Sequence, residues 1–126
     1  MEKSSTLYVR TLLLVDDNDD GRVLMKWFFD NFGYVVDSAR SAQEALSRFD
    51  PKTHDVILTD NSMPGMSGEE LAHIVKMRSP STFIVMFTGN PPQNRSCIDK
   101  LIQKPASLLD VKEAIDSLLE KKEAGG

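Results

Sequence analysis

The sequence predicts an α/β fold in which a single parallel sheet is covered by helices on both faces. Short apolar runs alternate with amphipathic helical segments along the chain. The runs are apolar on both faces, which is typical of strands buried in a parallel sheet. The chain has 126 residues, enough for one domain around one core. We therefore expect a single domain over residues 1–126, with its core between about residues 11 and 121.

The first two elements are a strand and a helix. Leu12–Val15 is a continuous apolar run and predicts the first buried strand. A helix is predicted over residues 22–32, with Gly33 as its C-terminal stop and Asp19 or Asp20 as its N-cap. The apolar residues that recur at helical spacing in this segment are Leu24, Trp27, Phe28 and Phe32.

The middle of the chain repeats this alternation. Strands are predicted over residues 34–39 and 56–59, and a helix over residues 41–49 lies between them. That helix opens with the capping-box pattern Ser41-Ala-Gln-Glu44 and ends before Pro51, which cannot continue a helix.

The last part of the chain adds two strands and two helices. A second capping box, Ser67-Gly-Glu-Glu70, opens a helix that runs through Met77. The apolar runs at residues 83–87 and 101–103 predict the fourth and fifth strands, and Ser107 caps a last helix. Together these elements make five strands, each followed by a helix or a helical connection, as a doubly wound sheet requires.

Composition argues against several classes of protein. The net charge of −4 disfavours a broad nucleic-acid or anionic-membrane surface. No apolar stretch approaches the ~20 residues of a membrane span, and the N-terminus has no signal-peptide pattern. Cys97 is the single cysteine, so a reducing, cytoplasmic location is expected. We interpret His54 and His73 as ordinary surface or boundary residues and expect residues 120–126 to fray.

Charged and hydroxyl side chains follow four of the predicted strands. They are Asp16 and Asp17 after the first strand, Asp60 after the third, Thr88 after the fourth and Lys104 after the fifth. Because the carboxyl ends of parallel strands meet at one edge, we expect these side chains to lie together. Crowded carboxylates raise each other's pKa unless a cation joins them, and Mg²⁺, or Mn²⁺ in its place, suits a shallow oxygen-lined site. The pattern predicts a phosphoryl-transfer site with Asp60 as nucleophile.

The chain resembles the receiver domains of two-component response regulators over residues 12–119. The motifs that carry the resemblance are LLLVDDN, SAQEAL, VILTDNSMPGMSGEEL, FTG and QKP. The third is the most specific, since Asp60, Met63-Pro64 and Gly68 match the family pattern D-x-x-M-P-x-x-x-G.

This resemblance implies a flavodoxin-like strand order, 2-1-3-4-5, and a role for each residue at the predicted edge. Asp60 is the implied phosphoacceptor. The implied metal ligands are Asp16, Asp17, Asp60 and the backbone carbonyl of Ser62, with Asp17 the more direct of the first two acids. Thr88 is the implied switch hydroxyl, and Lys104 is the implied phosphate-binding lysine, joined to Pro105 by a cis peptide bond.

The resemblance also implies partners. Such domains take a phosphoryl group from a phosphohistidine of a sensor histidine kinase or a histidine phosphotransfer protein, and they catalyse only their own phosphorylation and dephosphorylation. Phosphorylation then changes how an output partner binds the face built from the fourth helix, fifth strand and fifth helix. Formation of a homodimer on phosphorylation stays open. Neither direct nucleic-acid binding nor membrane binding is implied.

One stretch departs from the family pattern. The connection between the fourth and fifth strands is shorter than usual by roughly one and a half helical turns, and it contains Pro91-Pro92. The fourth helix is therefore predicted to be short, over residues 93–99, or replaced by a loop.

Leu101 stands where many relatives carry Tyr or Phe. We expect activation to move the segment 89–100 rather than an aromatic side chain. Ser62 and Asn90 occupy positions that tune phosphate hydrolysis in the family.

Two alternative functions remain open from the residues alone. A Mg²⁺-dependent phosphohydrolase of the haloacid dehalogenase type also uses an aspartyl nucleophile, although Asp17-Asn-Asp19-Asp20-Gly21 lacks the threonine of that family's D-x-D-x-T signature. An interaction module that is never phosphorylated is the second alternative. A flavodoxin is disfavoured because Asp16 and Asp17 would repel the phosphate of FMN.

Overall fold

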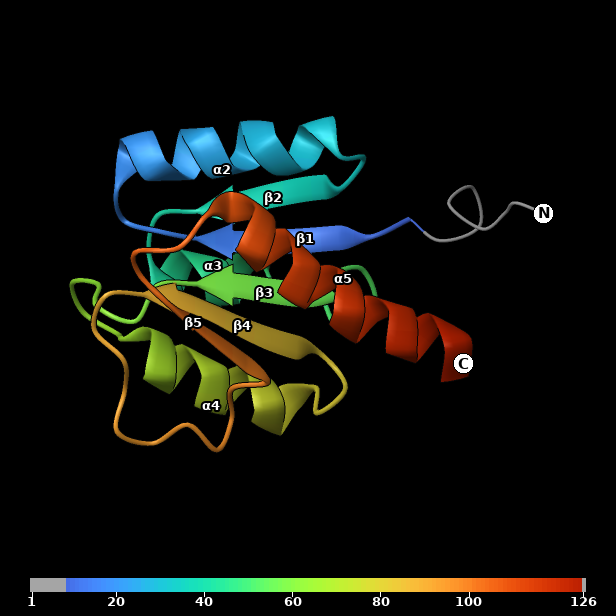
Figure 1. Cartoon of the computed structure of the whole chain (residues 1–126). Coiled ribbons are helices and arrows are strands. Elements are labelled where there is room, and N and C mark those ends of the chain that lie inside the picture. The colour runs from blue at the N-terminus through green and yellow to red at the C-terminus, as the bar shows by residue number, and fades with distance from the viewer. Residues whose placement is uncertain (1–8, 126) are drawn as a thin grey trace.

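The computed structural model describes residues 9–125, so residues 1–8 and 126 of the expected domain lie outside it. Five parallel strands form one sheet in the predicted order β2-β1-β3-β4-β5, with helices on both faces (Figure 1). The strands are β1 (Thr11–Val15), β2 (Val35–Ala39), β3 (Val56–Thr59), β4 (Phe83–Thr88) and β5 (Lys100–Gln103). The helices are α2 (Asp19–Asn31), α3 (Ala42–Arg48), α4 (Gly68–Arg78) and α5 (Leu108–Gly125).

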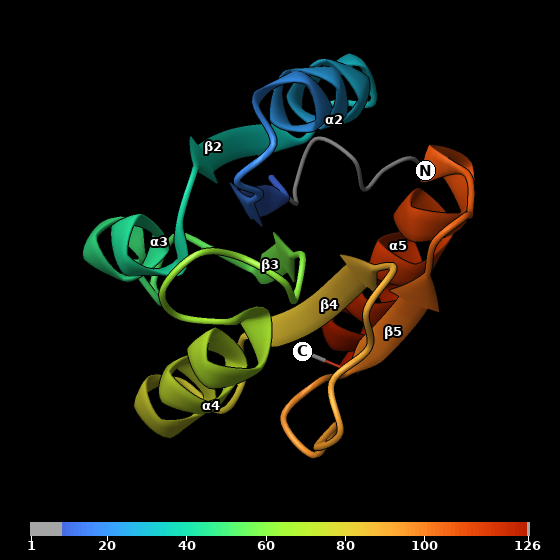
Figure 2. The same ribbon diagram turned by 90° about the vertical axis from the view of Figure 1, so that its left-hand side faces the viewer.

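The sheet separates two apolar layers. Helices α2 and α5 cover one face, and α3 and α4 cover the other (Figure 2). Side chains alternate along each strand. In β1, Leu12 and Leu14 therefore join the layer under α2 and α5, whereas Leu13 and Val15 join the layer under α3 and α4. None of the helices in residues 9–125 combines the length and the apolar character needed to cross a membrane.

The prediction that every strand is apolar on both faces holds for the central strands and is wrong for the two edges. Strand β2 exposes Val35 and Asp37, and β5 contains no buried residue. Both are outermost strands, which the helices cover only in part. Exposed or charged residues at a sheet edge also hinder pairing with another chain.

Helix α2 begins at Asp19, earlier than predicted, because its N-cap is Asn18 rather than Asp19 or Asp20. The Asn18 side chain accepts a hydrogen bond of 2.7 Å from the backbone N–H of Gly21. Asp19 and Asp20 lie in the first turn instead, where their charge is favourable near the positive end of the helix.

Most of the apolar residues that recur at helical spacing in α2 lie on a face exposed to solvent. Leu24, Trp27 and Phe32 are 55, 62 and 50% exposed, whereas Met25 and Phe29 fill the core. The helix is apolar on two sides, so its period alone does not tell which side packs on the sheet.

The two capping boxes differ. Ser67 and Glu70 form both hydrogen bonds of the motif at the start of α4. At α3, Ser41 accepts from the N–H of Glu44, but the Glu44 carboxylate accepts from Arg40 one position earlier. Both helices are nevertheless capped as predicted by a serine hydroxyl.

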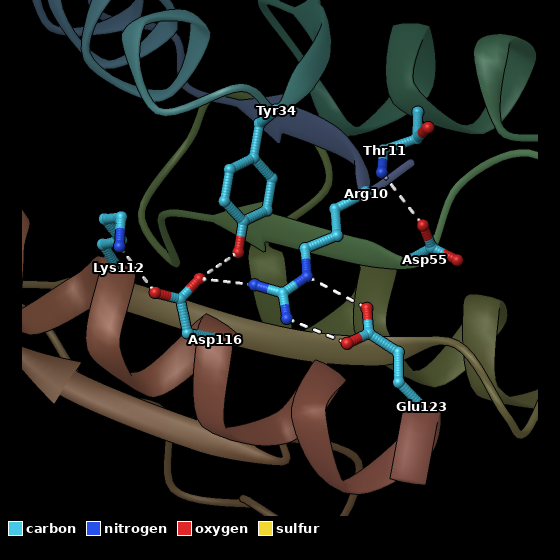
Figure 3. Close-up of polar contacts among 7 residues, drawn as sticks. All are labelled: Arg10, Thr11, Tyr34, Asp55, Lys112, Asp116 and Glu123. Atoms are coloured by element: carbon cyan, nitrogen blue, oxygen red, sulfur yellow. Dashed lines mark hydrogen bonds and ion pairs between the residues drawn. The ribbon is translucent and has the colours of Figure 1, made fainter. Parts of the chain in front are cut away.

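Helix α5 continues to Gly125, so the prediction of a frayed tail is wrong for residues 120–125. The cause is Arg10, which lies just before β1 at the amino end of the sheet (Figure 3). Its guanidinium donates to both carboxylate oxygens of Glu123 at 3.0 and 2.9 Å and to Asp116 at 3.1 Å. These contacts fix the last turns of α5.

Asp116 is the centre of this polar cluster. The Tyr34 hydroxyl donates to it at 2.5 Å, and the Lys112 ammonium lies 2.6 Å away (Figure 3). Burial, followed by the hydrogen bond to Asp116, raises the pKa of Tyr34. The phenol therefore remains a protonated donor, and α5 is joined to the turn before β2.

His54 is buried rather than at the boundary, with 3% of its surface exposed. Its Nδ1 accepts from the Asp50 N–H at 3.0 Å, and its Nε2 lies 2.7 Å from the Asp37 carboxylate. The ring also stacks on Phe49. His54 thereby joins the turn before β3 to strand β2, while His73 is exposed as predicted.

No helix forms between β4 and β5, which is one of the two predicted alternatives. Residues 89–99 form a loop containing Pro91-Pro92. Cys97 and Ile98 of this loop pack against the layer under α3 and α4, so the loop covers part of the sheet in place of a helix.

Candidate functional site

Figure 2 looks onto the carboxyl ends of the strands, which is the edge where the site was predicted. A cleft of about 390 Å³ opens at this edge, and its polar wall includes Asp16, Asp17, Asp60 and Lys104. The apolar side chains that line the same cleft are Leu24, Met25, Phe87, Ala106 and Leu108. Thr88 lies beside the cleft at the end of β4, fully buried, and its carbonyl accepts from the Lys104 N–H at 2.9 Å.

Asp60 follows β3 directly and is held by its neighbours. Its backbone carbonyl accepts from the Thr59 hydroxyl at 2.7 Å. Its carboxylate Oδ1 accepts from the Asn61 N–H at 2.6 Å, and its Oδ2 lies 3.5 Å from the Lys104 ammonium. One oxygen is thus fixed by the backbone while the other faces a positive charge.

Gly68 explains the specific spacing of the motif that contains Asp60. A Cβ atom at this position would lie 2.1 Å from the carbonyl oxygen of Asp60, a distance that no side chain can accept. The Gly68 N–H also donates to the Asn61 carbonyl at 2.9 Å. Between them, Met63 is buried in the core and Gly65 adopts a φ of 79°, which favours glycine. The loop is therefore folded tightly back against the residue after β3.

Asp16 is the most buried of the three acids, with 4% of its surface exposed. Its Oδ1 accepts from the Asn18 N–H at 2.9 Å. Burial raises the pKa of Asp16, and the charges of Asp60 and Asp17 add to the rise, whereas the hydrogen bond from Asn18 and the charge of Lys104 oppose it. Asp17 itself is exposed to solvent. The cluster therefore favours any added positive charge.

Lys104 is positioned by its surroundings. Its ammonium lies 5.0 Å from the centre of the Phe87 ring, which is a cation–π contact. The peptide bond between Lys104 and Pro105 is cis, as the resemblance implied.

The residues present suit a hard cation that keeps water ligands. Within residues 9–125, no three acidic, cysteine or histidine side chains are grouped tightly enough to enclose an ion by themselves. Mg²⁺ does not need such a cage, since it usually binds through one or two carboxylates and retains several waters. The open cleft offers the oxygen atoms of Asp16, Asp17 and Asp60, and oxygen ligands select Mg²⁺ over softer metals.

Asn61 lies at this edge and was not predicted from the sequence as a residue of the site. Its amide Nδ2 donates to the Asn90 carbonyl at 3.0 Å, and its Oδ1 accepts from the Glu69 N–H at 3.0 Å. The amide of Asn90 in turn donates to the Ser62 hydroxyl at 2.7 Å. Only the position of Asn61 next to Asp60 could have indicated such a role.

Comparisons with known proteins identify the family of this chain. Residues 12–116 match the family model of the response regulator receiver domain. The response regulator receiver protein CpdR of Brucella abortus is 33% identical over 116 residues, which are 87% of this chain and 96% of that protein. A putative transcriptional regulator of Haloferax volcanii is 30% identical over 113 residues, but the chain spans only 19% of its length.

Two solved structures containing the response regulator TrrA of Thermotoga maritima are also similar. The first, a complex with Mg²⁺ and BeF, has a TM-score of 0.81 at 27% identity and covers 87% of this chain and 99% of that one. The second, a complex with the histidine kinase ThkA, has a TM-score of 0.80 at 28% identity and covers 88 and 99%. With the family model matched over most of its length, this chain belongs to the response regulator receiver domain family.

Proposed function

We propose that this receiver domain accepts a phosphoryl group on Asp60 and thereby changes the binding of an output partner. The donor is a phosphohistidine on a sensor histidine kinase or on a histidine phosphotransfer protein. The observation that carries the proposal is the Asp60 carboxylate in an open cleft, next to two further acids and 3.5 Å from an ammonium. The TrrA complexes with Mg²⁺–BeF and with ThkA support it by similarity.

The proposed reaction is a displacement at phosphorus. A carboxylate oxygen of Asp60 forms a bond to phosphorus while the bond from phosphorus to the donor imidazole nitrogen breaks. The imidazole leaves with the bonding electron pair and takes up a proton, so no oxidant or reductant is required. The ammonium of Lys104 and the hydroxyl of Thr88 then donate hydrogen bonds to phosphoryl oxygens. The domain catalyses only its own phosphorylation and dephosphorylation.

The proposed ligands of Mg²⁺, or of Mn²⁺ in its place, are Asp16, Asp17, Asp60 and the backbone carbonyl of Ser62. When bound, the ion neutralises charge that develops on the transferring phosphoryl group. The ion would also stabilise the ionised form of Asp16, because burial raises the pKa of this carboxyl group and a nearby positive charge opposes that rise.

The proposed output surface lies on the side of the molecule formed by loop 89–99, β5 and α5. In this chain the loop stands where the family has a helix, so a partner would meet irregular backbone rather than a helical face. The same surface is the candidate contact for a homodimer of the phosphorylated domain. The chain spans only 19% of the Haloferax volcanii relative, so the output partner proposed here is defined by the surface that it would bind and not by that relative's function.

Incubation with acetyl phosphate and Mg²⁺, followed by intact-mass measurement, tests the proposal. We expect the mass of one phosphoryl group to be added, and we expect Asp60→Asn or chelation of the metal to abolish the addition. An unlabelled wild-type protein would favour an interaction module that is not phosphorylated. Continuous release of phosphate from a simple phosphate ester would favour the haloacid dehalogenase type of chemistry instead.

A further inference from the structure

The loop between β1 and α2 carries two of the three acids of the cleft and holds them in different ways. The Asp16 side chain is buried, its Oδ1 accepts from the Asn18 N–H at 2.9 Å, and its backbone N–H donates to the Ala39 carbonyl at 3.1 Å. Asp17 is exposed to solvent. An exposed side chain has little packing to hold it, so the direction of the Asp17 carboxylate depends mainly on the backbone that carries it.

Arg22, near the start of α2, holds this backbone from both sides of Asp17. Its Nη1 donates to the carbonyl oxygen of Asp16 at 2.8 Å, and its Nη2 donates to Asp19 Oδ1 at 2.6 Å. The Arg22 side chain is only 15% exposed, so solvent competes weakly for these contacts. The planar guanidinium presents several donors in a fixed fork, which lets it reach two acceptors at once. Arg22 therefore ties the end of β1 to the first turn of α2.

The contact with the Asp16 carbonyl determines how Asp17 leaves the strand. That carbonyl, the Asp17 N–H and the Asp17 Cα lie in one rigid peptide plane. A hydrogen bond to the oxygen restricts rotation of this plane, and with it the direction in which the Asp17 side chain leaves the backbone. The ion pair of Arg22 is made with Asp19, whereas the acids that line the cleft are Asp16, Asp17 and Asp60. Arg22 can therefore orient Asp17 without occupying a carboxylate of the cleft.

We infer that Arg22 is a positioning residue for cation binding, because it holds the peptide plane before Asp17 so that this carboxylate faces an ion shared with Asp16 and Asp60. This inference rests on the proposed function, in which Asp17 is a metal ligand. The charge of Arg22 and its positioning role have opposite consequences. A guanidinium repels a nearby cation, so removal of its charge by itself would tighten metal binding. Loss of a group that orients a ligand weakens metal binding instead, typically by about 10–100-fold.

Binding of Mn²⁺ to the full chain, with free Mn²⁺ measured by electron paramagnetic resonance, tests this role. Arg22→Gln should raise the Kd for Mn²⁺ by about tenfold or more, although it removes a positive charge. Arg40→Gln is the matched control, because it removes a positive charge from an exposed residue directly after β2 and should leave the Kd unchanged or lower. An unchanged or lower Kd for Arg22→Gln would overturn the inference.

A second variant covers the case in which circular dichroism shows that Arg22→Gln does not fold. Arg22→Lys keeps the positive charge but replaces the fork by a single ammonium, which cannot hold both acceptors in the same geometry. The Kd for Mn²⁺ should therefore rise in this variant as well. Wild-type affinity in a folded Arg22→Lys protein would overturn the inference, since charge alone would then account for the contribution of Arg22.

A double-mutant cycle with Asp17→Asn tests whether Arg22 acts through Asp17. In the Asp17→Asn background, Arg22→Gln should cause no further rise in the Kd for Mn²⁺, because the carboxylate that Arg22 orients is already absent. The same fold-loss of affinity in both backgrounds would contradict the inference. A wild type that binds Mn²⁺ and is labelled by acetyl phosphate, with Arg22 variants of equal affinity, would refute the role of Arg22 alone. A wild type that neither binds Mn²⁺ nor is labelled would refute the proposed function as well.

Discussion

The guanidinium of Arg10 binds both carboxylate oxygens of Glu123 at 3.0 and 2.9 Å, although 113 positions separate the two residues in the chain. Two parallel N–H···O contacts of this kind are stronger and more directional than a single ion pair. The side chains are 24 and 20% exposed, so solvent screens the pair only in part. The pair fixes the end of α5 to the beginning of β1 and stabilises the fold where neither element could do so alone.

Removal of this pair should destabilise the protein. We expect Glu123→Gln and Arg10→Met each to lower the free energy of unfolding by about 1–2 kcal/mol, a value already reduced for partial exposure. Urea denaturation followed by circular dichroism measures the change. Lys26→Met is the control, since its pair with Asp30 is half exposed and should contribute no more than about 0.5 kcal/mol. Equal losses in the two pairs would contradict the prediction.

Asp16→Asn should stabilise the metal-free protein, and the gain should grow with pH. Burial raises the pKa of Asp16 above its ordinary value of 3.8, so the folded state binds this proton more tightly than the unfolded state does. The stability contributed by the proton is fully present below 3.8 and is lost as the pH rises through the folded-state pKa. The difference in unfolding free energy between variant and wild type, measured across that range, should therefore increase with pH.

Mg²⁺ should reverse the order of these two proteins. An ion that binds only the folded state stabilises it by mass action, and the wild type offers one more carboxylate than the variant. Thermal melts at increasing Mg²⁺ concentration should show a rise in the midpoint for the wild type and a smaller rise for Asp16→Asn. Identical metal-dependent shifts would argue against a role for Asp16 at the ion.

Gly68→Ala should damage both stability and labelling of Asp60. The added Cβ would have to displace the Asp60 carbonyl that lies 2.1 Å away, at a cost of about 1–3 kcal/mol for an overpacked site. Gly125→Ala is the comparison, because nothing lies near a Cβ there and alanine favours a helix. Denaturation and acetyl phosphate labelling together check the prediction. A fully stable Gly68→Ala protein with normal labelling would refute it.

His54→Ala should be among the most destabilising single changes outside the core. The substitution leaves a cavity and removes the acceptor of the Asp50 N–H and the partner of Asp37, so a loss of about 3 kcal/mol is expected. His73→Ala, at an exposed position, should change the unfolding free energy by less than about 0.5 kcal/mol. Similar effects of the two substitutions, measured by urea denaturation, would show that the buried contacts of His54 contribute little.

The strands were accessible from the sequence because a parallel sheet leaves a strong local signal, whereas their order was implied by the resemblance to receiver domains. A buried strand such as β3 must be apolar on both faces, and the side chain after it, Asp60, falls at a defined edge. The loop between β4 and β5 was one of two predictions for this connection, because Pro91-Pro92 exclude a helix at their own positions but not over residues 93–99.

What the sequence did not reveal depends on contacts between distant residues. The sequence around Glu123 does not indicate that Arg10 binds this residue, and residues 120–126 were therefore predicted to fray. Likewise, α2 carries apolar residues on two sides, and only packing on the sheet decides that Phe29 is buried and Trp27 is not. His54 looked ordinary for the same reason, because its partner Asp37 belongs to another strand.

The cluster around Arg10 lies at the opposite end of the sheet from the cleft, and a five-residue strand such as β1 spans roughly 16 Å. Substitutions that far apart, with no shared neighbour, generally have additive energetic effects. Substitutions in the Arg10 cluster should therefore change thermal stability without changing the chemistry of the cleft. In a double-mutant cycle of Arg10→Met and Asp16→Asn, the two changes in the free energy of unfolding should add, with negligible coupling energy.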